Sequence, residues 1–431
     1  MAKKHTMWTD DLILTVRQSF AAIKDYRSHN CTYPLVDTLM GAFAMFHLKD
    51  PSLLAFREQF PYRSQNLKEV YGFEKIPEDS GLRKCLDQLD PSVLRPVFKT
   101  LIDRLRSDKI LDQKRVLGGY LALSADGTGY FCSTKNTCPH CLTRQVRPGE
   151  VQYHHQLLAS CIVHPGQKTV FPVAAEAIVR QDGCEKNDCE RNAAKRLFPQ
   201  IRQALPEEKI IVLLDALYAD GPTIRALQAE QCHYITTIKE GYVLLQVEKL
   251  AREGSLQEVT WYDGNAKCTA RFANGLVLNG QNQDILTNYL NYLEVDKHTG
   301  EPIYHNEWIT DLPIDKGNVR EMVQVARARW KIENETFNTL KNQGYHLEHN
   351  YGHGKQFLCT VFAILMFLAF LVDQIAQFAD IHFQKAMAKF KTRRAFWQRV
   401  QATFDVLPCV SMNVVYRFIA GEIQISLPKL E

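Results

Sequence analysis

Two apolar runs of strand type, far apart in the chain, are each followed by an aspartate. Residues 121–125 lead into Asp126, and the fully apolar run 210–214 leads into Asp215. In α/β proteins the ends of such strands meet at the carboxyl edge of the sheet, where ligand chemistry is placed. One aspartate at a strand end usually starts a turn or caps a helix, so each has weight only in combination with other acids.

A third acid, Glu333, lies in the strongly helical segment 329–341. Three carboxylates from two strand ends and a late helix form a ligand set for Mg²⁺ or Mn²⁺, because these hard cations prefer oxygen. Glu335 is a rival, but residues two apart on a helix point about 200° apart. Arg329 and Phe337 are each four residues from Glu333 and share its face. We therefore expect Glu333 on the functional side and Glu335 in solvent.

With these acids in place, the chain resembles a DDE-type transposase of a bacterial cut-and-paste insertion sequence. The resemblance spans about residues 121–355 and rests on three motifs in order: Ala125-Asp126-Gly127-Thr128, Leu214-Asp215-Ala216-Leu217-Tyr218 and Arg329-Trp330-Lys331-Ile332-Glu333-Asn334. It implies an RNase H-like α/β core interrupted by a β-rich insertion. It also implies that Asp126, Asp215 and Glu333 hold two Mg²⁺ or Mn²⁺ ions, one activating water or a 3′-hydroxyl and the other stabilising the leaving oxygen.

The resemblance also implies contacts with DNA. In that family an arginine one turn before the glutamate and a lysine two turns after it contact phosphates, and Arg329 and Lys341 match those positions. Many relatives carry a tyrosine three residues before the arginine, where this chain has Ala326, a departure that affects a phosphate contact and not the metal site. The partners implied are double-stranded DNA, as terminal inverted repeats and target, and a second copy of the chain, since two ends must be joined together.

The periodicity of apolar residues divides the chain into five segments. We expect a helical N-terminal region for DNA binding or dimer support (1–115), the first part of the core (116–240), a β-rich insertion (241–304), the second part of the core with the Glu333 helix (305–380) and a basic helical region (381–431). Strands are expected at 120–125, 157–163, 170–179, 210–214 and 234–238, and helices at 80–89, 92–106, 189–205 and 222–230. Adjacent strands followed by helix, strand, helix and strand fit an RNase H-like layer. Ser92 is the expected N-cap of the helix 92–106.

Cys138-Pro139-His140-Cys141 is a CxxC pattern, which suits one tetrahedral Zn²⁺ together with more distant ligands. We expect Cys138, Cys141, Cys189 and His155 to hold one structural Zn²⁺, with Cys184 nearby. The alternative is a cluster of reduced thiols, since twelve cysteines and no visible secretory signal indicate a reducing compartment.

Three further histidines, His346, His349 and His353, follow the Glu333 helix in a segment rich in glycine. We expect this segment to approach DNA or to pack as a polar loop, with a metal site the least favoured alternative.

Basic residues gather near the C-terminus, with no acid between Asp380 and Asp405. With the aromatic residues Phe390, Phe396 and Trp397 between them, they indicate a basic amphipathic helix suited to phosphate backbones. A merely solvated helix face is the alternative. The cations expected to bind DNA here are Lys385, Lys389, Arg393 and Arg394.

The apolar run 357–372 is the one segment that resembles a membrane helix. Its sixteen residues fall short of the roughly 20 that a spanning helix needs, and Asp373 ends it, so we expect a buried helix and no membrane partner. With no secretory signal visible, we expect a cytoplasmic location. The resemblance implies a bacterial cell, with the protein on the nucleoid when it is bound to DNA.

The formal net charge of +4 is too small to identify a nucleic-acid partner. Two other classes of function therefore remain beside a transposase. One is a sequence-specific DNA-binding protein that descends from a transposase and no longer cuts. The other is a zinc-stabilised scaffold in which the acids are incidental. Metal-dependent cleavage distinguishes them.

Overall fold

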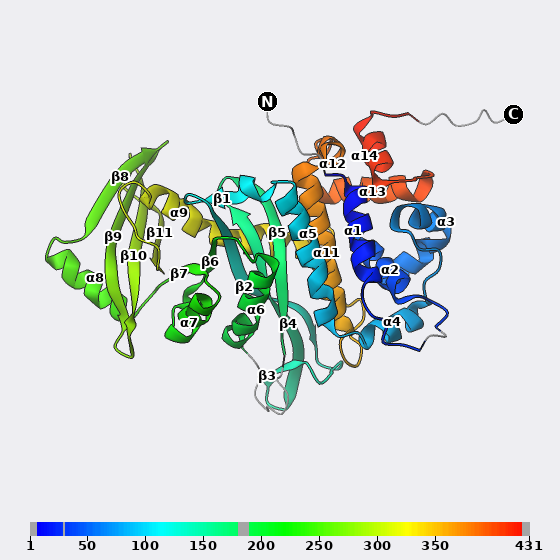
Figure 1. Cartoon of the computed structure of the whole chain (residues 1–431), viewed down its shortest axis with the longest axis horizontal. Coiled ribbons are helices and arrows are strands. Elements are labelled where there is room, and N and C mark those ends of the chain that lie inside the picture. The colour runs from blue at the N-terminus through cyan, green and yellow to red at the C-terminus, as the bar shows by residue number, and fades with distance from the viewer. Residues whose placement is uncertain (1–6, 29–30, 180–188, 425–431) are drawn as a thin grey trace.

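The computed structural model describes residues 7–28, 31–179 and 189–424, and the strands in these ranges form one mixed sheet of eleven (Figure 1). The strands are β1 (Arg115–Val116), β2 (Tyr120–Ser133), β3 (Leu142–Arg147), β4 (Glu150–His164), β5 (Gln167–Ile178), β6 (Ile210–Leu214), β7 (His233–Thr237), β8 (Gln257–Asp263), β9 (Ala266–Asn279), β10 (Asn282–Asp296) and β11 (Pro302–Thr310). The predicted α/β class is confirmed.

Five strands in the order β5-β4-β2-β6-β7 form the centre of the sheet. β2 pairs antiparallel with β4, and β4 with β5, whereas β2, β6 and β7 run parallel. Every residue of β6 is buried, which explains its uninterrupted apolar sequence. Parallel neighbours need crossover connections, and α6 (Glu190–Ala204) and α7 (Gly221–Ala229) supply them. All five strands were predicted from sequence.

β2 is longer than predicted. It continues past Asp126 to Ser133 and pairs with β4 as far as Tyr153. What ends near Asp126 is the parallel pairing with β6, whose last pair is Ser124 with Leu213. Asp126 is therefore inside a strand that keeps only one neighbour beyond this point.

Beyond β7 the sheet continues through β11, β10, β9 and β8, at the left of Figure 1. These strands extend to Thr310, past the predicted end of the β-rich insertion at residue 304, and residues 308–310 of β11 join them to the core by pairing with β7. The insertion also contains a helix that the prediction lacked, α8 (Tyr242–Arg252). Gly264, at φ 55°, turns the chain from β8 into β9, whereas Gly275 lies inside β9 where the pairing with β10 shifts register.

Helices from both ends of the chain pack together to the right of the sheet in Figure 1. They are α1 (Thr9–Ala21), α2 (Leu35–His47), α3 (Leu53–Tyr71), α4 (Asp79–Asp87) and α5 (Arg95–Ser107) from the N-terminal region, and α11 (Leu358–Ala379), α12 (Ile381–Met387), α13 (Arg393–Val406) and α14 (Met412–Ala420) from the C-terminal part. The expected cap at Ser92 is wrong, because Asp90 accepts the backbone N–H of Ser92 and caps the 3₁₀ turn η1 (Pro91–Leu94) that precedes α5.

The apolar helix α11 lies between β5 and α2. Among the described helices it is the one long and apolar enough to cross a membrane, and 94% of its most apolar window is buried inside the protein, as expected for a core helix. Asp373 does not end it, contrary to the prediction. The Asp373 carboxylate is buried with a counter-charge, since Lys49 Nζ lies 2.6 Å away and the Tyr345 hydroxyl donates to it at 2.5 Å.

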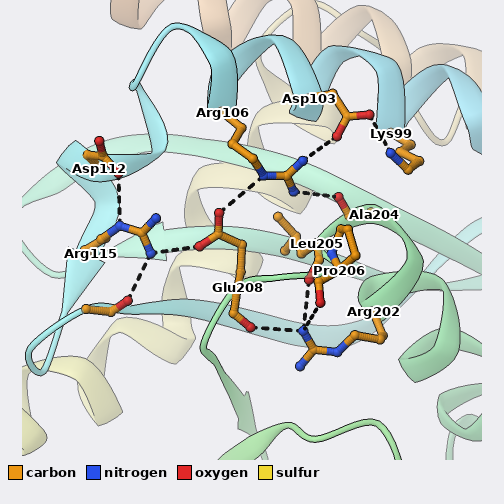
Figure 2. Close-up of polar contacts among 11 residues, drawn as sticks. Lys99, Asp103, Arg106, Asp112, Arg115, Arg202, Ala204, Leu205, Pro206 and Glu208 are labelled. Carbon is orange, nitrogen blue, oxygen red and sulfur yellow. Dashed lines mark hydrogen bonds and ion pairs between the residues drawn. The ribbon is translucent and has the colours of Figure 1, made fainter.

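Polar contacts around Glu208 join the helical region to the sheet (Figure 2). The buried Glu208 carboxylate lies 3.3 Å from Arg106 of α5 and 2.8 Å from Arg115 of β1. Arg202 of α6 donates to the Glu208 carbonyl at 3.0 Å. A buried carboxylate is stable only when it is paired, so Glu208 holds α5 and β1 against the segment that enters β6, the strand that directly precedes Asp215.

Candidate active site

Strand register places Asp126 and Asp215 at the same edge of the sheet. The last parallel pair joins Ser124 of β2 to Leu213 of β6. Asp126 follows two residues later within β2, and Asp215 follows two residues later, just past the end of β6. Asp215 begins the 3₁₀ turn η3 (Ala216–Tyr218), and its carboxylate accepts the backbone N–H of Leu217 at 2.9 Å.

The segment that carries Glu333 is not the regular helix that was predicted. A 3₁₀ turn, η4 (Ala328–Trp330), leads into a π-helical turn, η5 (Ile332–Phe337), and then α10 (Asn338–Asn342). Single π-helical turns are rare in proteins, and those that occur often lie at functional sites. Glu333 is half exposed, at 50% of its side chain. Glu335 is only partly exposed. Its charge acts on Lys331: burial lowers the pKa of Lys331, and the nearby Glu335 carboxylate opposes that shift.

Arg329 joins the strand to this helix. Its Nη1 lies 3.3 Å from Asp126 Oδ2, and its Nη2 lies 2.8 Å from Glu333 Oε1. The Ser124 hydroxyl donates to the Arg329 carbonyl at 2.8 Å, which holds η4 on β2. The structure therefore brings Arg329 and two of the three predicted acids into direct contact.

The three acids repel one another across this site. Burial raises the pKa of Asp126 to about 7, and the charges of Glu333 and Asp215 add to the rise. The charge of Arg329 and the backbone N–H of Gly127 oppose it. Arg329 and the Gly127 N–H therefore compensate only part of the cost of ionising Asp126, and a bound cation would supply the rest.

A fourth carboxyl group, Glu190 at the start of α6, belongs to the same place and was missed from the sequence. A Cβ on Gly127 would lie 2.3 Å from Glu190 Oε1, so the glycine makes room for this side chain. The Tyr218 hydroxyl donates to Glu190 Oε2 at 3.3 Å. Burial raises the pKa of Glu190, and the charge of Asp215 adds to it. In sequence Glu190 was hidden, because an acid in the first turn of a helix is ordinary.

The donor set suits divalent cations. Asp126, Asp215, Glu333 and Glu190 contribute four carboxylates, and Arg329 is the cation in contact with two of them. The surplus of negative charge and the exclusively oxygen ligands are the properties of sites for Mg²⁺ or Mn²⁺.

Lys341, predicted to contact phosphate, lies on α10 beside an open groove of about 400 Å³. Arg144 of β3 lines the same groove, which begins at Gly129, three residues beyond Asp126 on β2. Lys341 Nζ is paired with Glu348 at 2.8 Å. Two cations therefore line this groove, one of them already paired with an acid.

The predicted basic helix is two helices, α12 and α13, separated by residues 388–392. Lys385 is held by Glu422 at 2.5 Å. Phe396 and Trp397 point into the protein and are buried. Within the described residues no ion pair involves the other cations expected to bind DNA here, which are Lys389, Arg393 and Arg394. Arg394 acts on His346, which lies in the loop after α10. Burial lowers the pKa of His346, and the charges of His349 and Arg394 add to that shift.

Cys138, Cys141 and His155 converge as predicted, but the fourth member of the cluster is His353 and not Cys189. Cys189 is exposed at the start of α6, next to Glu190. The Glu190 carboxylate occupies the space that a side chain at Gly127 would fill. Gly127 is six residues, or about 20 Å, from the end of β2 at Ser133, so Cys189 lies far from the cluster. Cys184 lies outside the described residues.

A family model for the transposase DDE domain matches residues 150–371, just over half of the chain. The matched segment contains Asp215 and Glu333 and begins after Asp126. A search of curated proteins found no match.

Proposed function

We propose that this chain, which belongs to the family of transposases with a DDE domain, cleaves the ends of a bacterial insertion sequence and joins them to target DNA. The strand order β5-β4-β2-β6-β7, with three antiparallel strands followed by two parallel ones, supports an RNase H-like core for this reaction.

The observation that carries the proposal is the convergence of Asp126, Asp215 and Glu333. The first two leave neighbouring parallel strands at the same edge, and Arg329 ties the third to the first. Three acids separated by 89 and 118 residues in sequence meet at one place, and one of them has a strongly raised pKa. Perturbed acids gathered at a strand edge favour a catalytic site over incidental turn residues.

In this proposal Asp126, Asp215 and Glu333 hold two Mg²⁺ or Mn²⁺ ions. When bound, such ions stabilise the charge on the attacking and leaving oxygens of the phosphodiester. The chain itself orients the ligands. The N–H groups of Gly127 and Leu217 fix the carboxylates of Asp126 and Asp215, and Arg329 holds the carboxylates of Asp126 and Glu333 close together.

DNA would lie along the groove beside Lys341 and Arg144 and reach the basic segment of α12 and α13. Cations near the acids neutralise backbone phosphates without reading bases. Two copies of the chain would act on paired ends, since both ends must be cut and joined together.

The test is cleavage of DNA that carries the inverted repeats flanking the gene, with Mg²⁺ and with chelator. Asp126→Asn, Asp215→Asn and Glu333→Gln should each reduce cleavage at least about 10³-fold. The three acids act as one unit, so the loss of any one of them should cost about as much activity as the loss of all three. Each variant should still fold and bind the ends. Glu335→Gln is the matched control and should remain active.

Other outcomes identify the competing functions. End binding without cleavage by the wild-type protein, at any Mg²⁺ or Mn²⁺ concentration, would make it a DNA-binding protein that no longer cuts. If the wild-type protein neither binds nor cleaves the ends, the remaining function is that of a zinc-stabilised scaffold. Activity in Glu333→Gln with none in Glu335→Gln would reassign the third ligand.

A further inference from the structure

Two cysteines and two histidines from three separate segments meet beside the far end of β2. Cys138 and Cys141 lie in the connection from β2 to β3, and His155 lies on β4. His353 comes from the loop between α10 and α11. Cys141, His155 and His353 are buried, and Cys138 is partly exposed. These four residues are called the Cys2His2 cluster below.

The distances within the Cys2His2 cluster match the edges of a zinc tetrahedron. Zinc–sulfur bonds of about 2.3 Å and zinc–nitrogen bonds of about 2.0–2.1 Å imply edges of about 3.8 Å for S–S, about 3.6 Å for S–N and about 3.3 Å for N–N. The two sulfurs are 3.7 Å apart, and the two Nε2 atoms are 3.2 Å apart. His155 Nε2 lies 3.4 Å from Cys138 Sγ and 3.3 Å from Cys141 Sγ, and His353 Nε2 lies 3.3 Å from Cys141 Sγ.

Hydrogen bonds alone give a poor account of this geometry. His353 Nδ1 lies 2.9 Å from the Gly354 carbonyl, so Nδ1 carries the proton and the Nε2 of the neutral ring is a bare acceptor. A backbone acceptor on the remote nitrogen is also the usual support of a metal-bound histidine. His155 is held by packing against the rings of Tyr130 and Phe131. The four ligand atoms thus point at one another in a small, largely buried space.

We propose that the Cys2His2 cluster binds one structural Zn²⁺ and that His353, not Cys189, completes the site. Two thiolates and two imidazoles in tetrahedral array select zinc among common divalent ions. All four positions are filled by the protein, which leaves no open position for water or substrate, so the ion has a structural role and no catalytic one.

The ion would fasten the chain that follows the Glu333 segment. His353 belongs to residues 343–357, which connect α10 to α11, while the other three ligands belong to the hairpin of β2, β3 and β4. On its other side this loop is held by Asp87, whose carboxylate accepts the backbone N–H groups of Lys355 and Gln356 at 2.8 and 2.9 Å. Zn²⁺ would therefore fix one wall of the groove that Lys341 and His155 line.

The experiment is metal analysis of the full chain, loaded with Zn²⁺ and then freed of excess metal. We expect one Zn²⁺ per chain in the wild type, near zero in Cys141→Ser and His353→Ala, and one in the control variants Cys189→Ser and His349→Ala. Replacement by Co²⁺ should give the visible absorption of a tetrahedral site with thiolate ligands. His353→Cys, which keeps a ligand at this position, should retain the metal and change the Co²⁺ spectrum.

Wild-type protein that keeps well below one Zn²⁺, with Cys138 and Cys141 both reactive as free thiols or joined as a disulfide, would overturn the proposal. Loss of zinc from Cys189→Ser, or full zinc in His353→Ala, would overturn the assignment of the fourth ligand. Metal content and the Co²⁺ spectrum are measured without DNA, so they stand apart from the test of transposition. If His353→Ala does not fold, His353→Cys and the wild type still decide the question.

Discussion

Arg329 contacts Asp126 and Glu333 at once, at 3.3 and 2.8 Å, and so joins a central strand to the π-helical turn that faces it. Without divalent ions, this guanidinium supplies positive charge between two acids that would otherwise repel. The same arginine is the residue that the family resemblance assigns to DNA phosphate. Both roles are compatible if bound cations replace the guanidinium at the carboxylates and leave it to face DNA.

The first prediction follows from this competition. Arg329→Ala should tighten binding of Mn²⁺ in the absence of DNA by about tenfold, since unit charges about 4 Å apart interact by roughly 1–4 kcal/mol near a protein surface. DNA cleavage should fall about 10²-fold, because a cation beside the reacting phosphate is lost. Calorimetry with Mn²⁺ and a cleavage assay measure the two effects.

Arg327→Ala is the control for Arg329→Ala, because Arg327 is paired with Glu294 of β10 at 2.9 Å. It should leave Mn²⁺ affinity unchanged. Weaker Mn²⁺ binding in Arg329→Ala would show instead that the arginine mainly holds Glu333 in place.

The second prediction concerns pH and stability. The pKa of Asp126 is about 7 in the folded protein, against an ordinary value of 3.8. Between these values the folded state binds more protons than the unfolded state, so this group lowers the free energy of unfolding as pH rises from about 4 to about 7. Asp126→Asn removes this effect.

Asp126→Asn should therefore be more stable than the wild type at pH 8, by on the order of 1–4 kcal/mol, with little difference near pH 4. Denaturation by urea at both pH values, in buffer without Mg²⁺ or Mn²⁺, measures the difference. A difference independent of pH would contradict the raised pKa.

The third prediction concerns Glu190. Glu190→Gln should raise the Mg²⁺ concentration needed for half-maximal cleavage and leave the rate at saturating Mg²⁺ within about tenfold, because it removes negative charge beside Asp215 without removing a predicted ligand. Gly127→Ala should have a similar effect, since its Cβ would displace the Glu190 carboxylate. Glu207→Gln, at an exposed position, is the control. An unchanged Mg²⁺ requirement in Glu190→Gln would show that Glu190 only supplies negative charge to the first turn of α6.

The fourth prediction separates the basic residues by their ion pairs. Lys389→Gln and Arg394→Gln should each reduce the salt dependence of end binding by about one phosphate contact, a slope change of roughly 0.9. Lys385→Gln should change the slope less, because Lys385 is already paired with Glu422 at 2.5 Å. Titrations at several salt concentrations measure the slopes. Equal, unchanged slopes in all three variants would make this segment a solvated surface.

The sequence predicted the parts of the fold that depend on local pattern. An unbroken apolar run is enough to locate β6, because a strand buried on both faces has no polar positions. The five central strands, the helices between them and the core helix α11 were found in this way. The order of Asp126, Asp215 and Glu333 in their local contexts was also sufficient to indicate the family, and their catalytic role stays a prediction.

Contacts between distant segments were decided only by the tertiary structure. Asp373 continues α11 because Lys49, 324 residues earlier, compensates its charge. Glu190 joins the acids because α6 brings its first residue against Gly127. His353 meets Cys141 across 212 residues of sequence, and the predicted ligand Cys189 lies elsewhere. Periodicity records which side of an element is buried, whereas a ligand set depends on strand register and loop path, and these are determined by packing of the whole chain.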